Sequence, residues 1–425
     1  MTGLTAILPR RLDSAHPEGY NSNRCSKSII NPGKTMPLDY ARIQEQLIDL
    51  SEQFAERRAA EVGNASHAAV LLDSLAGQTA ETREKIMAAA EANPGLRSAI
   101  PTDEDLTGVF MPPVIHKHYT LLAADGSQVN PNRHDSIPFG VINIGVFRLD
   151  STLQVPPREI VETELLPLDA IYNEFGLVGE EVIALRRDLR ERQTLSRLAG
   201  EIDGTVLTLT DGPLELFRDP QGSRETQHEF EQYLSVLREL AEMGTITAGY
   251  VDRPGSDLVV RMLEIVSRKS GGETGEENTR PLAPLTDAFL FQNRLPPGAR
   301  SAIFAIQSQS ASSFTGETAL HFFYLNTGFT DKPSLARVEI PAWVANNTEM
   351  LGLLHAVLLE QCRHLGGQPY PYALHRSHEI ALVTMLDKDQ IEGMINRVLV
   401  SQGLPPAMPS NKQFAKNLSG RMRNR

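Results

Sequence analysis

The sequence contains few of the residues and patterns that mark several large classes of protein. Only two of its 425 residues are cysteines, Cys25 and Cys362, so neither a disulfide framework nor a thiolate zinc site is indicated. No apolar run approaches the roughly 20 residues of a membrane-spanning helix. The apolar stretch 4–8 is too short for a secretory signal. These absences favour a cytoplasmic protein that does not enter a membrane.

Several catalytic motifs are missing as well. The sequence has no G-x-x-x-x-G-K-[ST] loop, so we do not expect it to hydrolyse nucleoside triphosphates itself. It also has no G-x-S-x-G, HExxH or CxxC pattern. The net charge of −12 argues against a basic protein that coats nucleic acid. A nuclease remains compatible with this charge, because carboxylates that bind metal add negative charge of their own.

The composition changes along the chain and predicts several divisions. Residues 1–35 lack periodicity and are expected to be disordered, and Met36, which precedes a helical pattern, is a candidate start. Residues 36–112 are expected to be helical, with helices near 38–58, 65–75 and 79–92. A main domain should cover 113–403 with a flexible insertion at 268–281, and 404–425 should form a basic, disordered tail.

Strands and helices interleave in the main domain, which predicts an α/β fold. Strands are expected near 115–124, 141–149 and 152–163, before a long charged helix at 179–200. Because strands follow one another directly at first, the sheet should be mixed rather than purely parallel.

An apolar run followed by Asp and Gly occurs twice in this domain. The first run ends in Asp125-Gly126 and the second in Asp211-Gly212. Either copy alone is typical of a hairpin turn, since Asp-Gly is a common turn dipeptide. Together they would bring two carboxylates to neighbouring strand ends, and oxygen ligands suit Mg²⁺ or Mn²⁺.

Two further residues are candidates for this site. Glu191 lies on the charged helix just before the second strand, with Glu181 and Asp188 as rivals. A surface ion pair with Arg187, four positions earlier, is its alternative role. His378 opens an apolar run in a predicted loop, from which it could bind metal or shuttle a proton.

A predicted strand end carries a possible substrate-binding group. Tyr250, Arg253 and Ser256 supply an aromatic ring, a cation and a hydroxyl, which can stack on a base and hold a phosphate. A tyrosine at the sheet margin followed by an ordinary Pro-Gly turn is the alternative.

At this point the order of the motifs resembles the NurA nuclease family, from about residue 119 to 403. The matching segments are Ala-Ala-Asp-Gly-Ser-Gln (123–128), Leu-Thr-Asp-Gly-Pro-Leu (209–214), Ala-Gly-Tyr-Val-Asp-Arg-Pro-Gly-Ser (248–256), Pro-Pro-Gly-Ala-Arg-Ser-Ala-Ile-Phe (296–304), Phe-Phe-Tyr-Leu (322–325), Arg-Val-Glu-Ile-Pro (337–341) and Gly-Gly-Gln-Pro-Tyr-Pro-Tyr-Ala-Leu-His-Arg-Ser-His-Glu (366–379). The resemblance implies an RNase H-like core and a ring-shaped homodimer. It also implies Mn²⁺-dependent DNA cleavage, with Mg²⁺ as the alternative metal, by a 5′–3′ exonuclease and single-strand endonuclease. The implied partner is a HerA-type hexameric ATPase in double-strand-break end resection.

The resemblance assigns the site residue by residue. Asp125, Glu191, Asp211 and His378 match the family's catalytic and metal-binding set, and their expected reaction leaves a 5′-phosphate. Asp252 departs from the lysine expected at that position, which weakens the substrate-binding assignment. Two other functions remain open: a DNA-end adaptor or gating subunit that kept the fold but lost the chemistry, and a nuclease that acts on RNA.

Overall fold

This computed structural model describes residues 38–405, apart from 136, 153, 175, 217–223, 269–278 and 330. The predicted extension 1–35, most of the insertion 268–281 and nearly all of the tail 404–425 therefore lie outside the described residues. The chain divides into two compact units, Met1–Ala55 and Glu56–Arg425. None of the described helices is long and apolar enough to cross a membrane.

The N-terminal region contains fewer helices than predicted, and it also contributes a strand. One continuous helix, α1 (Tyr40–Ser74), replaces the two expected at 38–58 and 65–75. Ala59, Ala60 and Glu61 between them favour helix, and Gly63 costs only about 1 kcal/mol there. Helix α2 (Thr79–Ala92) lies where predicted. Strand β1 (Ser98–Pro101) corrects the expectation that 36–112 is wholly helical, because it pairs with a strand from the main domain.

The second unit is built on a nine-stranded mixed sheet with the order β1-β9-β10-β11-β8-β7-β2-β3-β4. The strands not yet bounded are β2 (Thr120–Val129), β3 (Val141–Asp150), β4 (Arg158–Leu165), β7 (Val206–Asp211), β8 (Ile246–Asp252), β9 (Phe304–Gln307), β10 (Leu320–Asn326) and β11 (Leu335–Pro341). Strands β2, β3 and β4 form an antiparallel meander, and β7 and β8 continue the sheet parallel to β2. This arrangement is that of an RNase H-like core, and it confirms the predicted mixed α/β sheet.

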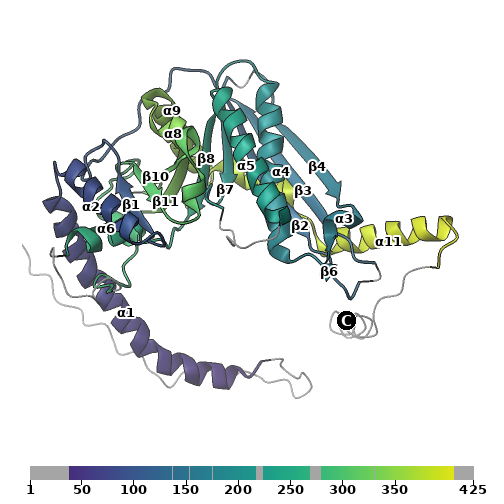
Figure 1. The fold of residues 1–425 in the computed structure, drawn as a ribbon, viewed down its shortest axis with the longest axis horizontal. Coiled ribbons are helices and arrows are strands. Elements are labelled where there is room, and N and C mark those ends of the chain that lie inside the picture. Colours follow the sequence, from purple (N-terminus) through teal and green to yellow (C-terminus); the bar gives the residue numbers. More distant parts are fainter. Residues whose placement is uncertain are drawn as a thin grey trace, which may run out of the picture. The chain divides into compact units, whose positions relative to one another are not determined.

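Helices cover both faces of this sheet. The remaining α-helices and strands are α3 (Leu168–Ile171), β5 (Tyr172–Asn173), β6 (Gly176–Leu177), α4 (Glu180–Gly200), α5 (Arg224–Glu242), α6 (Leu258–Val266), α7 (Asp287–Phe291), α8 (Ala342–Ala345), α9 (Thr348–Arg363), α10 (Tyr372–Ala381) and α11 (Met385–Ser401). Helices α4 and α5 lie side by side (Figure 1), and their apolar residues share one core with Leu122 and Ala124 of β2. Residues of α9 and α10 share the other core with Leu121 and Ala123. Because successive side chains of β2 point to opposite faces of the sheet, they contribute alternately to the two cores.

Two local predictions were wrong, and both concern the candidate site. Strand β2 does not turn at Gly126 but continues to Val129, because all ten of its residues pair with β3. His378 lies on helix α10, not in a loop. The apolar run that it was expected to open is the last turn of that helix.

Candidate active site

The two aspartates of the Asp-Gly motifs lie at the point where β2 and β7 separate. The last parallel pair between these strands is Ala124 with Thr210, and each aspartate is the next residue. Strand β7 ends at Asp211, where Gly212 turns the chain with a φ of 86°, a conformation that glycine adopts without strain. The expected placement at neighbouring strand positions therefore holds, although Asp125 lies within its strand.

Helix α10 brings His378 onto Asp125. The Nδ1 atom of His378 lies 2.7 Å from Oδ2 of Asp125, while the other carboxylate oxygen accepts a hydrogen bond from the backbone N–H of Gly126. The helix lies unusually close to the sheet, since an added Cβ on Gly145 of β3 would be 2.5 Å from the backbone nitrogen of Ala381. The missing side chain at position 145 therefore allows this approach.

Gly126 has a similar role on the opposite side of β2. An added Cβ there would lie 2.7 Å from Oε1 of Glu191 and 2.6 Å from Cγ of Arg187, both on α4. The hairpin-turn alternative for Asp125-Gly126 would make this glycine a turn residue. Instead, it leaves space for two charged side chains of the helix to lie against the strand.

The structure separates the three helix carboxylates that the sequence left as rivals. Glu191 is only 7% exposed and lies in the cavity described below, and Asp188 lines the same cavity. Glu181 is exposed in the first turn of α4 and does not line it. Arg187 pairs with both inner carboxylates, at 2.7 Å from Asp188 and 3.5 Å from Glu191. Glu191 thus both forms an ion pair with Arg187 on the same helix and lines the cavity.

The surroundings make these carboxyl groups unfavourable sites for negative charge. Burial raises the pKa of Glu191 well above its ordinary value, and the nearby Asp188 raises it further. The pKa of Asp188 is raised mainly by burial, against the lowering effect of Arg187. Burial also raises the pKa of Asp211. A cluster of buried acids with this behaviour is stabilised by added positive charge.

Tyr370 is a further side chain in contact with this cluster. Its hydroxyl donates a hydrogen bond to Asp211, and this bond lowers the pKa of that carboxyl group, opposing the effect of burial. The ring packs edge-on against Tyr250, at 5.6 Å between centroids. The tyrosine, which lies just before α10, therefore orients Asp211.

The aspartates, Glu191, Arg187 and His378 surround one cavity of about 270 Å³. It is lined by Asp125, Gly126, Ser127, Arg187, Asp188, Glu191, Asp211, His378, Ala381 and Leu382. Within the described ranges, no three His, Cys, Asp or Glu side chains are already arranged to hold a metal ion. The chemistry of the set nevertheless fits a hard divalent cation, because four carboxylates and an imidazole face one space with a single guanidinium between them.

The predicted substrate-binding residues have different environments. Tyr250 is 0% exposed, so it cannot stack on a base as predicted; its hydroxyl lies 3.9 Å from Sγ of Cys362. Ser256 is partly buried, and its hydroxyl lies 2.9 Å from that of Tyr324. Arg253 alone projects from the surface, with its side chain 89% exposed.

Sequence reasoning missed the roles of Arg187 and Tyr370. The spacing shows Arg187 only as the helical neighbour of Glu191 and gives no sign that both side chains lie over a glycine in a strand. Tyr370 lies in a Gly-, Pro- and Tyr-rich segment that was used only for the family resemblance. Its proximity to Asp211 depends on how α10 docks, which no local pattern records.

Comparisons with known proteins give the family. The sequence model of the NurA domain matches residues 119–383, more than half of the chain. No curated protein matches the sequence. The solved structures that are similar include the NurA nuclease from Sulfolobus solfataricus, at 12% identity and a TM-score of 0.47, over 85% of this chain and 98% of that chain. Endonuclease V from Ciona intestinalis, bound to inosine-containing DNA, matches at 13% identity and a TM-score of 0.30, over 81% of this chain and 99% of that chain. On the domain match, the chain belongs to the NurA family.

Proposed function

We propose that this protein is a metal-dependent DNA nuclease whose active site is the cavity around Asp125. The observation that carries the proposal is the convergence of Asp125, Glu191, Asp211 and His378 on one cavity in a chain of the NurA family. We assign the four residues to metal binding and catalysis. The proposed activities are 5′–3′ exonuclease and single-strand endonuclease cleavage.

The side chains are suited to divide the work of phosphodiester hydrolysis. If Nδ1 of His378 donates its proton to Asp125, Nε2 is left with a free lone pair, which can bind the metal ion proposed below. Tyr370 holds Asp211 in one orientation. The clustered acids Glu191 and Asp188 are the groups that most need a counter-charge.

We propose Mn²⁺ as the resident metal, with Mg²⁺ as the alternative. Asp125, Glu191, Asp211 and His378 would hold it. When bound, such a cation neutralises charge on the phosphate and lowers the pKa of a bound water. The leaving group would be the 3′-oxygen, so the product would carry a 5′-phosphate.

The family supports further proposals about assembly. The sequence has no nucleotide-binding loop of its own, which suits a nuclease that works in the cytoplasm with a HerA-type translocating ATPase at DNA double-strand breaks. We also propose a homodimer. Helix α11 has exposed apolar side chains that a second copy could cover, among them Met385, Leu386, Met394 and Val398.

The test of the nuclease proposal is the variant Asp125→Asn. It keeps the size of the side chain while removing its charge and its ability to bind metal strongly. We expect single-strand and duplex-end digestion with Mn²⁺ to fall at least about 100-fold, with an unchanged circular dichroism spectrum. Undiminished cleavage by a folded variant would overturn the proposal.

A DNA-end adaptor is the second candidate, and two observations favour it. The carboxylates are paired with Arg187 instead of forming a ready metal cage among the described residues, and Asp252 stands where a basic residue is expected. An adaptor would bind DNA equally well in EDTA and would not cleave it with any metal. A nuclease that acts on RNA is distinguished by comparing DNA and RNA of one sequence.

A further inference from the structure

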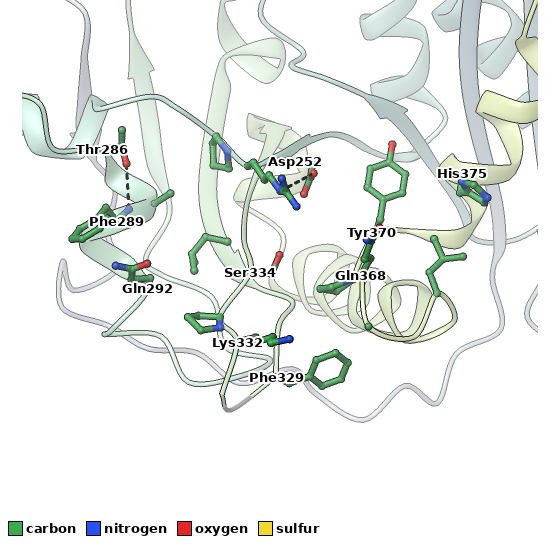
Figure 2. A pocket seen from close by; sticks show the side chains of 18 residues that line it. Asp252, Thr286, Phe289, Gln292, Phe329, Lys332, Ser334, Gln368, Tyr370 and His375 are labelled. Atoms are coloured by element: carbon green, nitrogen blue, oxygen red, sulfur yellow. Dashed lines mark hydrogen bonds and ion pairs between the residues drawn. The ribbon is translucent and has the colours of Figure 1, made fainter. Parts of the chain in front are cut away.

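A second and larger cavity, of about 810 Å³, lies beside the proposed active site. It is formed by the end of β8, helix α7, the β10–β11 hairpin and the segment that precedes α10. Figure 2 shows Phe289 and Gln292 on one side, Tyr370 and His375 on the other, and Phe329 and Lys332 of the hairpin below. We call this cavity the groove. Its volume is within the range of sites for small organic ligands, about 300–1,000 Å³.

The charge of the groove is opposite to that of the whole chain. Its lining residues include the cations Arg253 and Lys332, and Asp252 is the only carboxylate among them. The protein as a whole carries a net charge of −12. A local excess of positive charge on an acidic protein is a feature of sites for anionic ligands.

The backbone at Arg253 is strained. Its φ is 45°, and no other non-glycine residue that the structure describes has a positive φ. Glycine or asparagine would adopt this conformation at lower cost. The side chain is 89% exposed, and its ion pair with Asp252 is long, at 4.0 Å. An exposed cation held in a strained conformation suggests that its position matters for a ligand.

The hairpin adds an aromatic ring next to the second cation. Phe329 and Lys332 pair through two backbone hydrogen bonds of 3.1 Å, which hold their side chains at the mouth of the groove. Phe329 is 46% exposed, so its ring is accessible to a ligand. An exposed ring beside a lysine can stack on an unpaired base while the lysine contacts a phosphate.

The groove is connected to the proposed active site through two residues. Tyr370 lines the groove, and its hydroxyl reaches Asp211. His375 also lines it and lies one helical turn before His378, which lines the active-site cavity. A strand that occupied the groove would therefore continue directly to the proposed catalytic residues.

We propose that the groove binds an unpaired DNA strand next to the phosphate that is cleaved. Arg253 and Lys332 contact phosphates, and Phe329 stacks on a base. The inference rests on the proposed nuclease function and adds a reason for acting on single strands, since a paired base has no free face for Phe329. Asp252 is beside Arg253 and so limits how many phosphates this end of the groove accepts.

Binding can be tested without cleavage, by fluorescence anisotropy of a labelled single-stranded DNA in EDTA over a series of salt concentrations. Arg253→Gln and Lys332→Gln should each reduce the slope of log affinity against log salt by about 0.7, the value for one phosphate contact on a single strand. Lys85→Gln is the matched control, because Lys85 is half-exposed on α2, outside the residues that line the groove, and pairs with Glu81 one turn away. It should leave the slope unchanged.

The stacking contact has its own variants. Phe329→Ala should weaken binding of the single strand roughly tenfold, whereas Phe329→Tyr, which keeps the ring, should bind like the wild type. Duplex DNA of the same sequence should not distinguish these variants. Equal binding of the strand by all the groove variants and by Lys85→Gln would overturn the inference.

Cleavage with Mn²⁺, measured in parallel, separates this inference from the proposed function. If the wild type cleaves DNA but the groove variants bind and cleave as it does, the proposed DNA binding in the groove is wrong, while the proposed nuclease activity is supported. If no DNA is cleaved but the groove variants lose affinity, DNA binding in the groove is supported and the proposed nuclease activity is wrong. Tighter binding of RNA than of DNA would overturn the assignment of the strand as DNA.

Discussion

His378 Nδ1 lies 2.7 Å from Asp125 Oδ2, although 253 positions separate the two residues in the chain. The contact joins α10 to β2, the third strand from one edge of the nine-stranded sheet. It holds a side chain that is 65% exposed against one that is 18% exposed. Because the imidazole is largely exposed to water, the contact is worth only about 0.2–1 kcal/mol. It therefore stabilises the docking of α10 only slightly, and it orients Asp125.

Glu191 should be more important for activity than the other glutamate considered on α4. We expect Glu191→Gln to lower DNA cleavage at least about 100-fold, beyond the 10- to 100-fold typical of residues that only orient a ligand. Glu181→Gln is the matched control, because Glu181 is exposed outside the cavity. Steady-state cleavage rates with Mn²⁺ measure the difference. Equal loss in both variants would mean that Glu191 is not the helix ligand.

Arg187 should compete with a bound cation for the same carboxylates. In Arg187→Gln the repulsion between Asp188 and Glu191 is no longer offset, so the metal-free protein should melt at a lower temperature. Mn²⁺ should bind roughly tenfold more tightly, equal to about 1.4 kcal/mol, and the metal should raise the melting temperature more than it does in the wild type.

Calorimetric titration and thermal melts with and without Mn²⁺ measure both effects of Arg187. Arg190→Gln is the matched control, since Arg190 is on the same helix but pairs with Glu164 of β4. A tighter metal site in the control as well would show that the effect is one of total charge, not of the contact with Asp188 and Glu191.

Gly145 should tolerate no side chain. In Gly145→Ala the new methyl group would meet backbone atoms of α10, at 2.5 Å from Ala381 N and 2.7 Å from Ser377 O. We expect a loss of about 1–3 kcal/mol in the free energy of unfolding and a large loss of cleavage, because His378 moves with the helix. Gly63→Ala is the opposite case: it lies in α1 with nothing within 4 Å of the new methyl group, and it should stabilise the protein slightly. Urea unfolding with both variants measures the contrast.

Asp287 should make stability depend on pH near neutrality. It is fully buried and accepts hydrogen bonds from Val259 N–H, Val260 N–H and the hydroxyl of Tyr324. Burial outweighs these bonds and raises the pKa of Asp287 from 3.8 to about 7. Between these two values the native protein binds more protons than the unfolded chain. The free energy of unfolding should therefore fall as the pH rises through this range, by up to about 4 kcal/mol.

Asp287→Asn removes this titration and should flatten that part of the curve. The variant should be less stable at low pH. The asparagine side chain has one acceptor oxygen, whereas the three donors around Asp287 now use both of its oxygens. Urea unfolding at several pH values between 4 and 8 gives the curve, with Asp103→Asn as the control for loss of a surface carboxylate. A slope in Asp287→Asn equal to that of the wild type would show that another group causes it.

Periodicity predicted most of the helices and strands of the main domain. The long helix of 179–200 and the strand of 141–149 are close to the observed α4 and β3, because each pattern is long. The interpretation failed where a short signal had two meanings. Asp125-Gly126 is a turn signal locally, but pairing with β3 carries the strand through it. The local sequence also could not predict that Tyr250 is buried, because its burial depends on α9 and α10, which come more than 90 residues later.

Two strand positions without side chains, Gly126 and Gly145, set the distances at which the helices approach the sheet. A homologue could therefore keep all four acidic and histidine positions and still be inactive if either glycine were replaced. In a survey of genomes such a chain would be counted as a nuclease on its ligands alone. Functional classification within the family should accordingly examine these two empty positions together with the charged ones.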